Sequence, residues 1–578
     1  MPLSTSDIAQ KYHKRLPIAN LPDRQWPSKS QDKAPIWLST DLRDGNQALP
    51  SPMNFEQKWK FFHLLLAMRF KQIEISFPCA SETEFAFTRS VADSSGVVPD
   101  DVTLEVIAPC RKDTLARAVE SIRGARNVII FTFLATSDNY QETIFEASEE
   151  ALLERARTCV EYLRSITKDD PYASSQTNWS FGFGFEDFGN SRPEVALRLA
   201  ETVKAAWRPT PDKPIILGLA TSVESYTPNV YADQVEYFSR NISNRDAVCI
   251  SLHTHNDRGC AVASAELGTL AGADRVEGCL FGNGERAGNL DLVTMGLNYL
   301  TQGIDPGLDF SILPRARQVY EEITGLPIHP RAPYAGDYYF RAFSGSHQDA
   351  IRKGLKKYSA AEAESNVQPT WRIPYLPLDP ADVGLTFDCV IGINSQSGKS
   401  GVSWVLRQGL QLNIPDVLAS VFSKYVKSES ERVSRALVER EVCDLFLRTY
   451  AVGEVDSRVW VRQINGAQFS MNLDTCARRS VGDIALHISQ VLGRYVRPVQ
   501  NHKDQFISEA TRKVTYVECT LDGASLGWGV GIGADGKENV RAIISALSST
   551  GLINAETGLP SPQSPTAASL DGGEMSLS

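Results

Sequence analysis

The chain has 578 residues, enough for about two to four domains of ordinary size, although a single barrel could account for half of it. Hydrophobic residues make up 42% of the chain and charged residues 22%, which are ordinary values for a globular protein. The formal net charge is -10 and no long basic run occurs, so neither nucleic acid nor an anionic membrane surface is an expected partner.

The ten cysteines are scattered without a CxxC pair, which argues against a zinc ribbon or a disulfide framework and favours a reduced setting. No apolar run approaches the ~18 residues of a transmembrane helix. The segment from Met1 to Arg15 lacks the apolar core of a signal peptide, and its Asp7 does not suit a transit peptide. We therefore expect a cytoplasmic protein.

Prolines that break any long helix predict an extended arm over residues 1–34. Between residues 35 and 305, apolar strand-like runs alternate mostly with helical patterns, such as Glu142 to Thr167. The predicted strands are Ile36–Asp41, Gln72–Phe77, Val102–Ile107, Val128–Phe133, Trp179–Gly184, Ile215–Leu219, Val248–His253 and Arg275–Phe281. Eight strands in this order are typical of a TIM (β/α)8 barrel, an α/β fold.

The pattern changes after the barrel. Residues 306–430 are predicted to form linker subdomains. The stretch Ile414 to Leu447, which starts in this region and extends beyond it, is predicted to form two helices. Short strand and helix patterns over residues 431–555 predict a small α+β domain. The segment 556–578 is rich in proline, serine and glycine, so we expect a disordered tail.

Polar residues gather at the predicted carboxyl ends of the barrel strands, which form the catalytic rim of TIM-barrel enzymes. They follow strands 1, 5, 6, 7 and 8 and include Arg43, Asp44, Glu186, Ser222, His253, His255 and Asn289. A random scatter of structural polar residues would not be confined to one end of the strands. The sequence therefore predicts a catalytic site on this rim.

His253 and His255 lie two residues apart at a strand end, so their imidazoles can converge on one point. Taken alone, such a pair is more often two hydrogen-bonded histidines than a metal site. Together with Asp44 and Asn289 it offers two nitrogens and two oxygens, a set that fits Mg, Mn, Zn or Co. Arg43 would hold a substrate carboxylate or a developing oxyanion; alternatively, Arg43 and Asp44 form a local ion pair.

Glu186 follows a strand end crowded with phenylalanines. An apolar environment of this kind would raise its pKa and suit a general base or acid, whereas an exposed loop position would leave it without a role. Gly282-x-Gly284 is a poor match to a dinucleotide fingerprint, because it follows the last barrel strand; it predicts a tight loop. His347 and Tyr375 lie outside the barrel, where each alone is more often structural.

Several long motifs resemble those of the 2-isopropylmalate synthase family. They are Leu38 to Gln47, His253 to Gly259, Phe281 to Asn289, Phe343 to Asp349, Pro374 to Pro377 and Asn394 to Lys399. The resemblance runs from about residue 21 to about residue 407 and is weaker beyond. It implies a Claisen condensation of acetyl-CoA with a 2-oxo acid, assisted by a divalent metal cation (Mg, Mn or Zn).

The resemblance also implies roles for individual residues. Asp44, His253, His255 and Asn289 are similar to the family's metal ligands, Arg43 to its substrate-polarising group and Glu186 to a catalytic carboxylate. His347 and Tyr375 would act from a region that comes from the partner subunit, so the resemblance implies a domain-swapped homodimer. The C-terminal domain resembles a leucine-sensing domain, but its glycine motif is missing around Asn465, so a purely structural domain is the alternative.

The departures from the leucine-pathway pattern concern the 2-oxo acid pocket. Where that pattern has larger or more polar residues, this chain has Phe131, Gly184, Gly218 and Ser222. Smaller residues beside an aromatic wall predict extra room for a bulky aryl substrate, such as 4-hydroxyphenylpyruvate or phenylpyruvate, used for homo-aromatic amino acids in specialised metabolism. The alternative is 3-methyl-2-oxobutanoate, the substrate of leucine biosynthesis.

Two further classes remain open. A lyase of the same superfamily would run the reverse cleavage, but the His347 and Tyr375 region and the extra domain favour a synthase. A catalytically silent homologue would need a lost metal ligand, and each of the four expected ligands is present.

Overall fold

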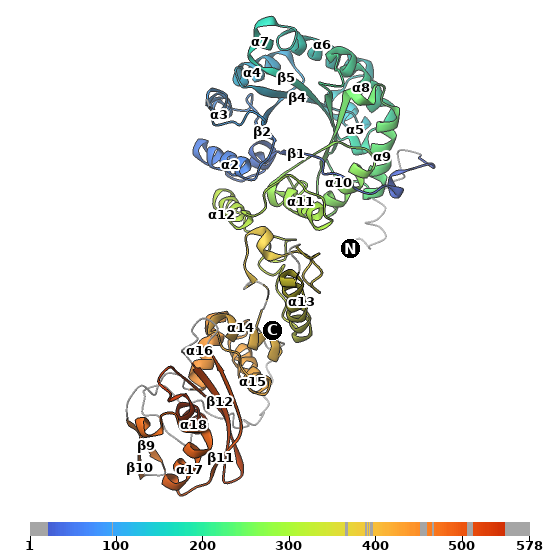
Figure 1. The fold of residues 1–578 in the computed structure, drawn as a ribbon. Coiled ribbons are helices and arrows are strands. Elements are labelled where there is room, and N and C mark those ends of the chain that lie inside the picture. Colours follow the sequence, from blue (N-terminus) through green and yellow to red (C-terminus); the bar gives the residue numbers. More distant parts are fainter. Residues whose placement is uncertain are drawn as a thin grey trace, which may run out of the picture. The chain divides into compact units, whose positions relative to one another are not determined.

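The computed structural model describes residues 21–94, 96–364, 368–387, 390, 392–393, 397–450, 459–464, 467–505 and 513–548. The chain divides into two compact units (Figure 1). One unit comprises Met1–Phe340 and Leu378–Thr386, and the other comprises Arg341–Pro377 and Phe387–Ser578. None of the helices in the described ranges is long and apolar enough to cross a membrane.

The first unit contains a closed barrel of parallel strands surrounded by helices (Figure 1). The barrel has eight strands, and β8 pairs with β1. The strands are β1 (Ile36–Ser39), β2 (Gln72–Ser76), β3 (Thr103–Pro109), β4 (Asn127–Ala135), β5 (Asn178–Glu186), β6 (Ile215–Thr221), β7 (Val248–Thr254) and β8 (Arg275–Gly278). All eight predicted strands are confirmed, and so is the predicted fold class. Their carboxyl ends form one rim, where the predicted polar residues lie.

Helices surround the barrel. They are α2 (Phe55–Ala67), α3 (Glu82–Asp93), α4 (Lys112–Ile122), α5 (Asp138–Tyr140), α6 (Glu149–Ser165), α7 (Pro171–Gln176), α8 (Pro193–Trp207), α9 (Pro228–Asn241), α10 (Ala261–Leu270), α11 (Leu292–Thr301) and α12 (Leu313–Thr324). The helix predicted from Glu142 begins only at Glu149, because the Ser148 side chain caps it by accepting a hydrogen bond from the Ala151 amide.

The described part of the predicted arm packs on the barrel unit. Trp26 is buried, and its indole nitrogen donates to Asp233 of α9 at 2.8 Å. The backbone amides of Gln25 and Trp26 donate to the Glu236 carboxylate. These hydrogen bonds hold Gln25 and Trp26 against α9. The proline content had predicted only that this segment is not helical.

The second unit contains helices followed by strands. The helices are α13 (Gly345–Glu364), α14 (Lys399–Gly409), α15 (Asp416–Val433), α16 (Glu439–Thr449), α17 (Val481–Leu492) and α18 (Glu538–Ser548). The strands are β9 (Val459–Ile464), β10 (Ala467–Asn472), β11 (Val496–Gln505), β12 (Lys513–Leu521) and β13 (Ala524–Gly533).

Strands β11, β12 and β13 form an antiparallel sheet with a core on each face. Val517 and Cys519 pack with buried residues of α17 and α18, whereas Tyr516 and Trp528 pack with those of α14, α15 and α16. The predicted C-terminal α+β architecture is therefore confirmed. The glycine-motif remnant at Asn465 and the predicted tail lie outside the described residues.

Candidate active site

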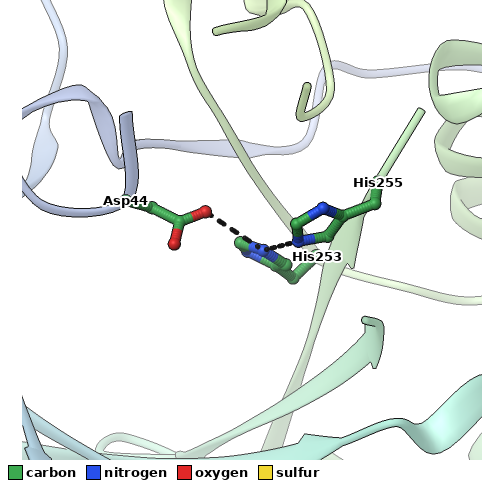
Figure 2. A group of neighbouring side chains, drawn as sticks. All are labelled: Asp44, His253 and His255. Carbon is green, nitrogen blue, oxygen red and sulfur yellow. Dashed lines mark hydrogen bonds and ion pairs between the residues drawn. The ribbon is translucent and has the colours of Figure 1, made fainter. Parts of the chain in front are cut away.

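Asp44, His253 and His255 meet at the carboxyl-terminal rim of the barrel (Figure 2). One potential ligand atom from each lies within 4.8 Å of the others. His253 is the second-to-last residue of β7, and His255 directly follows that strand. The structure thus brings together three of the four predicted metal ligands from two distant segments of the chain.

A five-residue π-helical turn, Asp41–Gly45, presents Asp44 to the rim. The amides of Arg43, Asp44 and Gly45 all donate to the carbonyl oxygen of Thr40, at the end of β1. Single π-helical turns of this kind are frequent at functional sites. Because the turn follows β1 at once, it places Arg43 and Asp44 beside each other at the mouth of the barrel.

The loop after β8 supplies Asn289, the fourth predicted ligand. This loop is joined to the end of β7, since the Leu290 amide donates to the carbonyl of Thr254 at 2.9 Å. Asn289 donates its side-chain nitrogen to Asp44 Oδ2 at 2.7 Å. Its Oδ1 is buried and has no hydrogen-bond partner among the described residues. A Cβ at Gly284 would lie 2.7 Å from this amide nitrogen, so the loop needs a glycine there.

The charges around the cluster favour cation binding. Burial opposes ionisation of Asp44, but Arg43 and the two histidines hold the pKa of its carboxyl below the usual value. Burial, and next the charge of His253, lower the pKa of His255 to about 3. The site therefore offers an anionic carboxylate and, at His255, the neutral imidazole that metals require.

The donor set fits a divalent cation, and the unpartnered Asn289 Oδ1 supports this, because a buried oxygen without a partner is costly unless a cation or a ligand satisfies it. One feature requires a change on binding. Arg286 approaches His255 Nδ1 at 3.0 Å, and a guanidinium can only donate, so the His255 proton lies on Nε2. That Nε2 faces His253 Nε2 at 3.2 Å, and it must lose the proton before it can bind a metal.

Arg43 lies beside the cluster. Its Nη1 donates to Asp44 Oδ1 at 2.5 Å and its Nε donates to Glu74 Oε2 at 2.8 Å, so the guanidinium is held between two carboxylates. A guanidinium has five N–H groups, and these two bonds leave others for a substrate oxygen. The ion pair expected as the alternative for Arg43 and Asp44 is present, and it orients Arg43 at the site.

Glu186 is the last residue of β5 and is partly buried. Burial, and next the charge of neighbouring Asp187, raise the pKa of its carboxyl. The predicted direction and its cause, burial, agree with the structure, but the phenylalanines of β5 do not provide that burial. Strand alternation turns them away from the barrel interior and toward the outer helices, so that Phe181 packs on Trp207 and Phe185 packs on Phe238.

The expectation of extra room beside Phe131 was also wrong. A Cβ at Gly182 would lie 2.3 Å from the Phe131 ring, one at Gly184 would lie 2.8 Å from it, and one at Gly218 would lie 2.9 Å from it. The Phe131 ring, which is only 6% exposed, therefore fills the space that these glycines leave. The small residues and the large one compensate each other in volume, because adjacent strands bring them face to face.

Phe131 belongs to an apolar cluster of the barrel. The cluster contains buried Ile107, Ile129, Phe131, Ile216 and Cys249, with partly buried Phe77 and Phe133 packed against it. Ser222, predicted as a residue that lines the 2-oxo acid pocket, accepts a hydrogen bond at its Oγ from the Asp187 amide at 2.8 Å. It connects the ends of β5 and β6 and so fixes the backbone next to Glu186.

His347 and Tyr375 lie in the second unit, and their rings stack with centroids 3.9 Å apart. Tyr375 is 63% exposed and has a φ of 61°, a left-handed conformation that is uncommon for a bulky residue. The structure brings these two predicted residues together with each other. His347 is partly buried, and of the two residues only Tyr375 has the left-handed backbone.

Sequence reasoning missed Glu277, whose Oε2 lies 3.3 Å from His253 Nδ1. It also missed its buried partners Ser251 and Arg275. The available signal was the occurrence of Arg275 and Glu277 two residues apart in a predicted buried strand. Charged residues inside a barrel are costly unless they are paired, so both should have been singled out.

Comparison with known proteins places this geometry in a family. Residues 34–319 match the HMGL-like family model, and residues 337–407 match the model for the post-catalytic domain of alpha-isopropylmalate synthase. The chain is 54% identical over 562 residues to isopropyl malate synthase gloH of Glarea lozoyensis, covering 92% of this chain and 91% of the relative.

The chain belongs to the isopropylmalate synthase family. It is also 54% identical over 553 residues to isopropyl malate synthase htyA of Aspergillus rugulosus, covering 94% of each chain. The 2-isopropylmalate synthase of Schizosaccharomyces pombe is 43% identical over 570 residues, covering 94% of this chain and 96% of the relative. Members of the isopropylmalate synthase family are acetyl-CoA-dependent acyltransferases, so the predicted enzyme class is confirmed, and the similarity extends well beyond the barrel.

Proposed function

We propose that this isopropylmalate synthase homologue condenses acetyl-CoA with a 2-oxo acid to give a 2-substituted malate and CoA. The observation that carries the proposal is the rim cluster of Asp44, His253, His255 and Asn289, with Arg43 beside it. A divalent cation held there would act as a Lewis acid on the keto group of the 2-oxo acid.

The side chains around the cluster have the remaining tasks. Arg43, fixed between Asp44 and Glu74, donates to the keto oxygen and stabilises the negative charge that develops on it. Glu186 takes a proton from the methyl group of acetyl-CoA, because its raised pKa makes it a stronger base than an ordinary carboxylate. The resulting carbon nucleophile attacks the keto carbon, and hydrolysis of the thioester releases CoA.

We propose an aryl 2-oxo acid, 4-hydroxyphenylpyruvate or phenylpyruvate, as the favoured substrate, for synthesis of a homo-aromatic amino acid in specialised metabolism. The support is the apolar cluster that contains Phe131, with the partly buried rings of Phe77 and Phe133 packed against it. Aromatic walls favour an aromatic side chain through edge and face contacts. The alternative is 3-methyl-2-oxobutanoate, whose condensation would make this a leucine-pathway enzyme.

The substrate is tested by CoA release across a panel of 2-oxo acids. We expect kcat/KM to be about tenfold or more higher for the two aryl acids than for 3-methyl-2-oxobutanoate, since contacts of this kind give ~1–3 kcal/mol of discrimination. Phe131→Leu should reduce this preference. Phe181→Leu is the matched control, because it removes a buried ring from the next strand on the face that packs on α8. A wild-type preference for 3-methyl-2-oxobutanoate would overturn the aryl assignment.

We further propose that His347 and Tyr375 complete the site of the partner subunit in a domain-swapped homodimer. The support is that their rings stack, with Tyr375 exposed, in the unit that does not contain the barrel. His347 would move a proton at the reacting oxygen, with Tyr375 orienting its ring.

Complementation tests the shared site. Asp44→Asn and His347→Ala should each be inactive alone, whereas co-expression should recover about a quarter of wild-type activity, because one site of each mixed dimer then carries neither change. Each variant co-expressed with itself is the control. Mixed dimers without activity would show that both residues serve the same site of one chain.

A further inference from the structure

Glu277 sits behind the predicted metal ligand His253, on the side away from Asp44. The sheet register pairs His253 of β7 with Glu277 of β8, and Glu277 is only 4% exposed. Its Oε2 lies 3.3 Å from His253 Nδ1. An ionised carboxylate only accepts hydrogen bonds, so the His253 proton must lie on Nδ1.

We propose that Glu277 is a positioning residue that presets His253 for metal binding, which extends the cation site of the proposed function. With the proton on Nδ1, the lone pair of His253 Nε2 faces the cluster, 3.5 Å from Asp44 Oδ2 and 3.2 Å from His255 Nε2. A carboxylate on the far nitrogen of a metal-binding histidine fixes both the tautomer and the ring plane, and it increases the basicity of the ligand nitrogen.

The second oxygen of Glu277 is held by two donors, so the carboxylate cannot rotate away from His253. Ser251 Oγ donates to Oε1 at 2.6 Å, and Arg275 Nη2 donates to the same oxygen at 2.7 Å. Arg275 Nε in turn donates to Ser251 Oγ at 2.8 Å. Ser251 and Arg275 are themselves paired in the register, two residues before His253 and Glu277. The four side chains therefore form one closed arrangement inside the barrel.

Arg275 is fully buried and also binds a second carboxylate. Its Nη1 donates to Glu105 Oε2 at 2.8 Å and to Gln72 Oε1 at 3.0 Å. Arg275 therefore contacts two carboxyl groups, Glu105 and Glu277. Of these two carboxylates, only Glu277 contacts a predicted metal ligand, whereas Glu105 binds Arg275. This difference provides an internal control for the role of Glu277.

The second histidine lacks such support. Its Nδ1 faces the exposed Arg286, a donor, instead of a buried carboxylate. His253 is thus in its ligand tautomer before the metal arrives, whereas His255 must change tautomer. We expect His253 to contribute more than His255 to the metal affinity of the site. Removal of Glu277 should abolish most of this contribution.

The test measures metal affinity of the full-length protein after metal removal, by competition with a chromophoric chelator for Zn²⁺. Glu277→Gln should weaken binding about 10- to 100-fold, the usual cost of losing a carboxylate behind a ligand histidine. Glu105→Gln keeps the pair between Arg275 and Glu277 and should leave the affinity nearly unchanged. The d–d absorption of bound Co²⁺ should change in Glu277→Gln and not in Glu105→Gln, a signature that a loss of stability alone would not produce.

Equal losses of affinity in the two variants, or no loss in Glu277→Gln, would overturn the positioning role and leave only a structural one. If Glu277→Gln does not fold, Ser251→Ala replaces it, because it removes one donor to Glu277 Oε1 without changing any charge; it should also weaken Zn²⁺ binding and alter the Co²⁺ spectrum. Failure of the wild-type protein to bind either metal would instead refute the proposed function itself.

Discussion

Replacing Asp44 by Asn should lower the rate of CoA release by about a thousandfold. Asp44 supplies the anionic oxygen of the rim cluster and faces both histidines and Arg43. Asn keeps the shape but removes the charge, and the Lewis-acid effect of a bound cation is worth several kcal/mol, or roughly a factor of ten for each 1.36 kcal/mol. The measurement is a thiol assay with acetyl-CoA and the preferred 2-oxo acid, together with the metal content of the purified protein.

Asp101→Asn is the matched control for this prediction. Asp101 is 64% exposed and pairs with Lys71 on the surface, so the same chemical change should leave both the rate and the metal content unaltered. An Asp44→Asn enzyme that retains metal and works within tenfold of the wild-type rate would contradict the assignment of this cluster as the catalytic centre.

Glu186→Gln should lower kcat by about 10²- to 10⁴-fold, the range usual for loss of a general base. The amide has nearly the same size but cannot accept the methyl proton of acetyl-CoA. Because we propose that the 2-oxo acid and the cation bind at the cluster of Asp44, His253 and His255, the KM for the 2-oxo acid should change little. A large rise in KM with an unchanged kcat would show that Glu186 binds substrate and does not transfer a proton.

The pH dependence of kcat tests the same residue independently. Glu186 must be ionised to accept a proton, so kcat should rise with pH as the carboxyl titrates. Since burial and the charge of Asp187 raise its pKa, the midpoint should lie above the ordinary value of 4.5. Asp187→Asn removes the neighbouring charge and should move the midpoint to lower pH, while Asn tolerates the left-handed backbone at this position, where φ is 57°.

Strand alternation and the polar residues at strand ends were sufficient to predict the barrel and its catalytic rim. Parallel strands bring their carboxyl ends to one edge, so Asp44 and His253 could be placed together although 209 residues separate them along the chain. The predicted strands agree with those observed because each is a short apolar run between helical patterns.

Side-chain direction across strands could not be predicted in the same way. The phenylalanines before Glu186 were expected to surround it, yet alternation directs them to the outer helices. The glycines near Phe131 were interpreted as vacated volume, because each position was considered without its neighbour in the sheet. In the register of the sheet, Phe131 lies opposite Gly182, and Gly184 lies opposite Gly218. Only this register shows that the ring occupies the space beside the glycines.

Glu277 was missed for a related reason. Its proposed positioning role depends on its register with His253, and the sequence contains no local sign of that pairing. A buried Arg-x-Glu in a strand indicates that partners exist, but it does not identify them. The barrel closure that brings β7 next to β8 is a property of the whole fold.

The position of the Phe131 ring against three glycines restricts which substitutions these sites tolerate. A methyl group at residue 182, 184 or 218 would overlap the ring, so none of the three can take a larger residue while Phe131 keeps this position. A design that enlarges any of these residues therefore has to begin with a smaller side chain at residue 131.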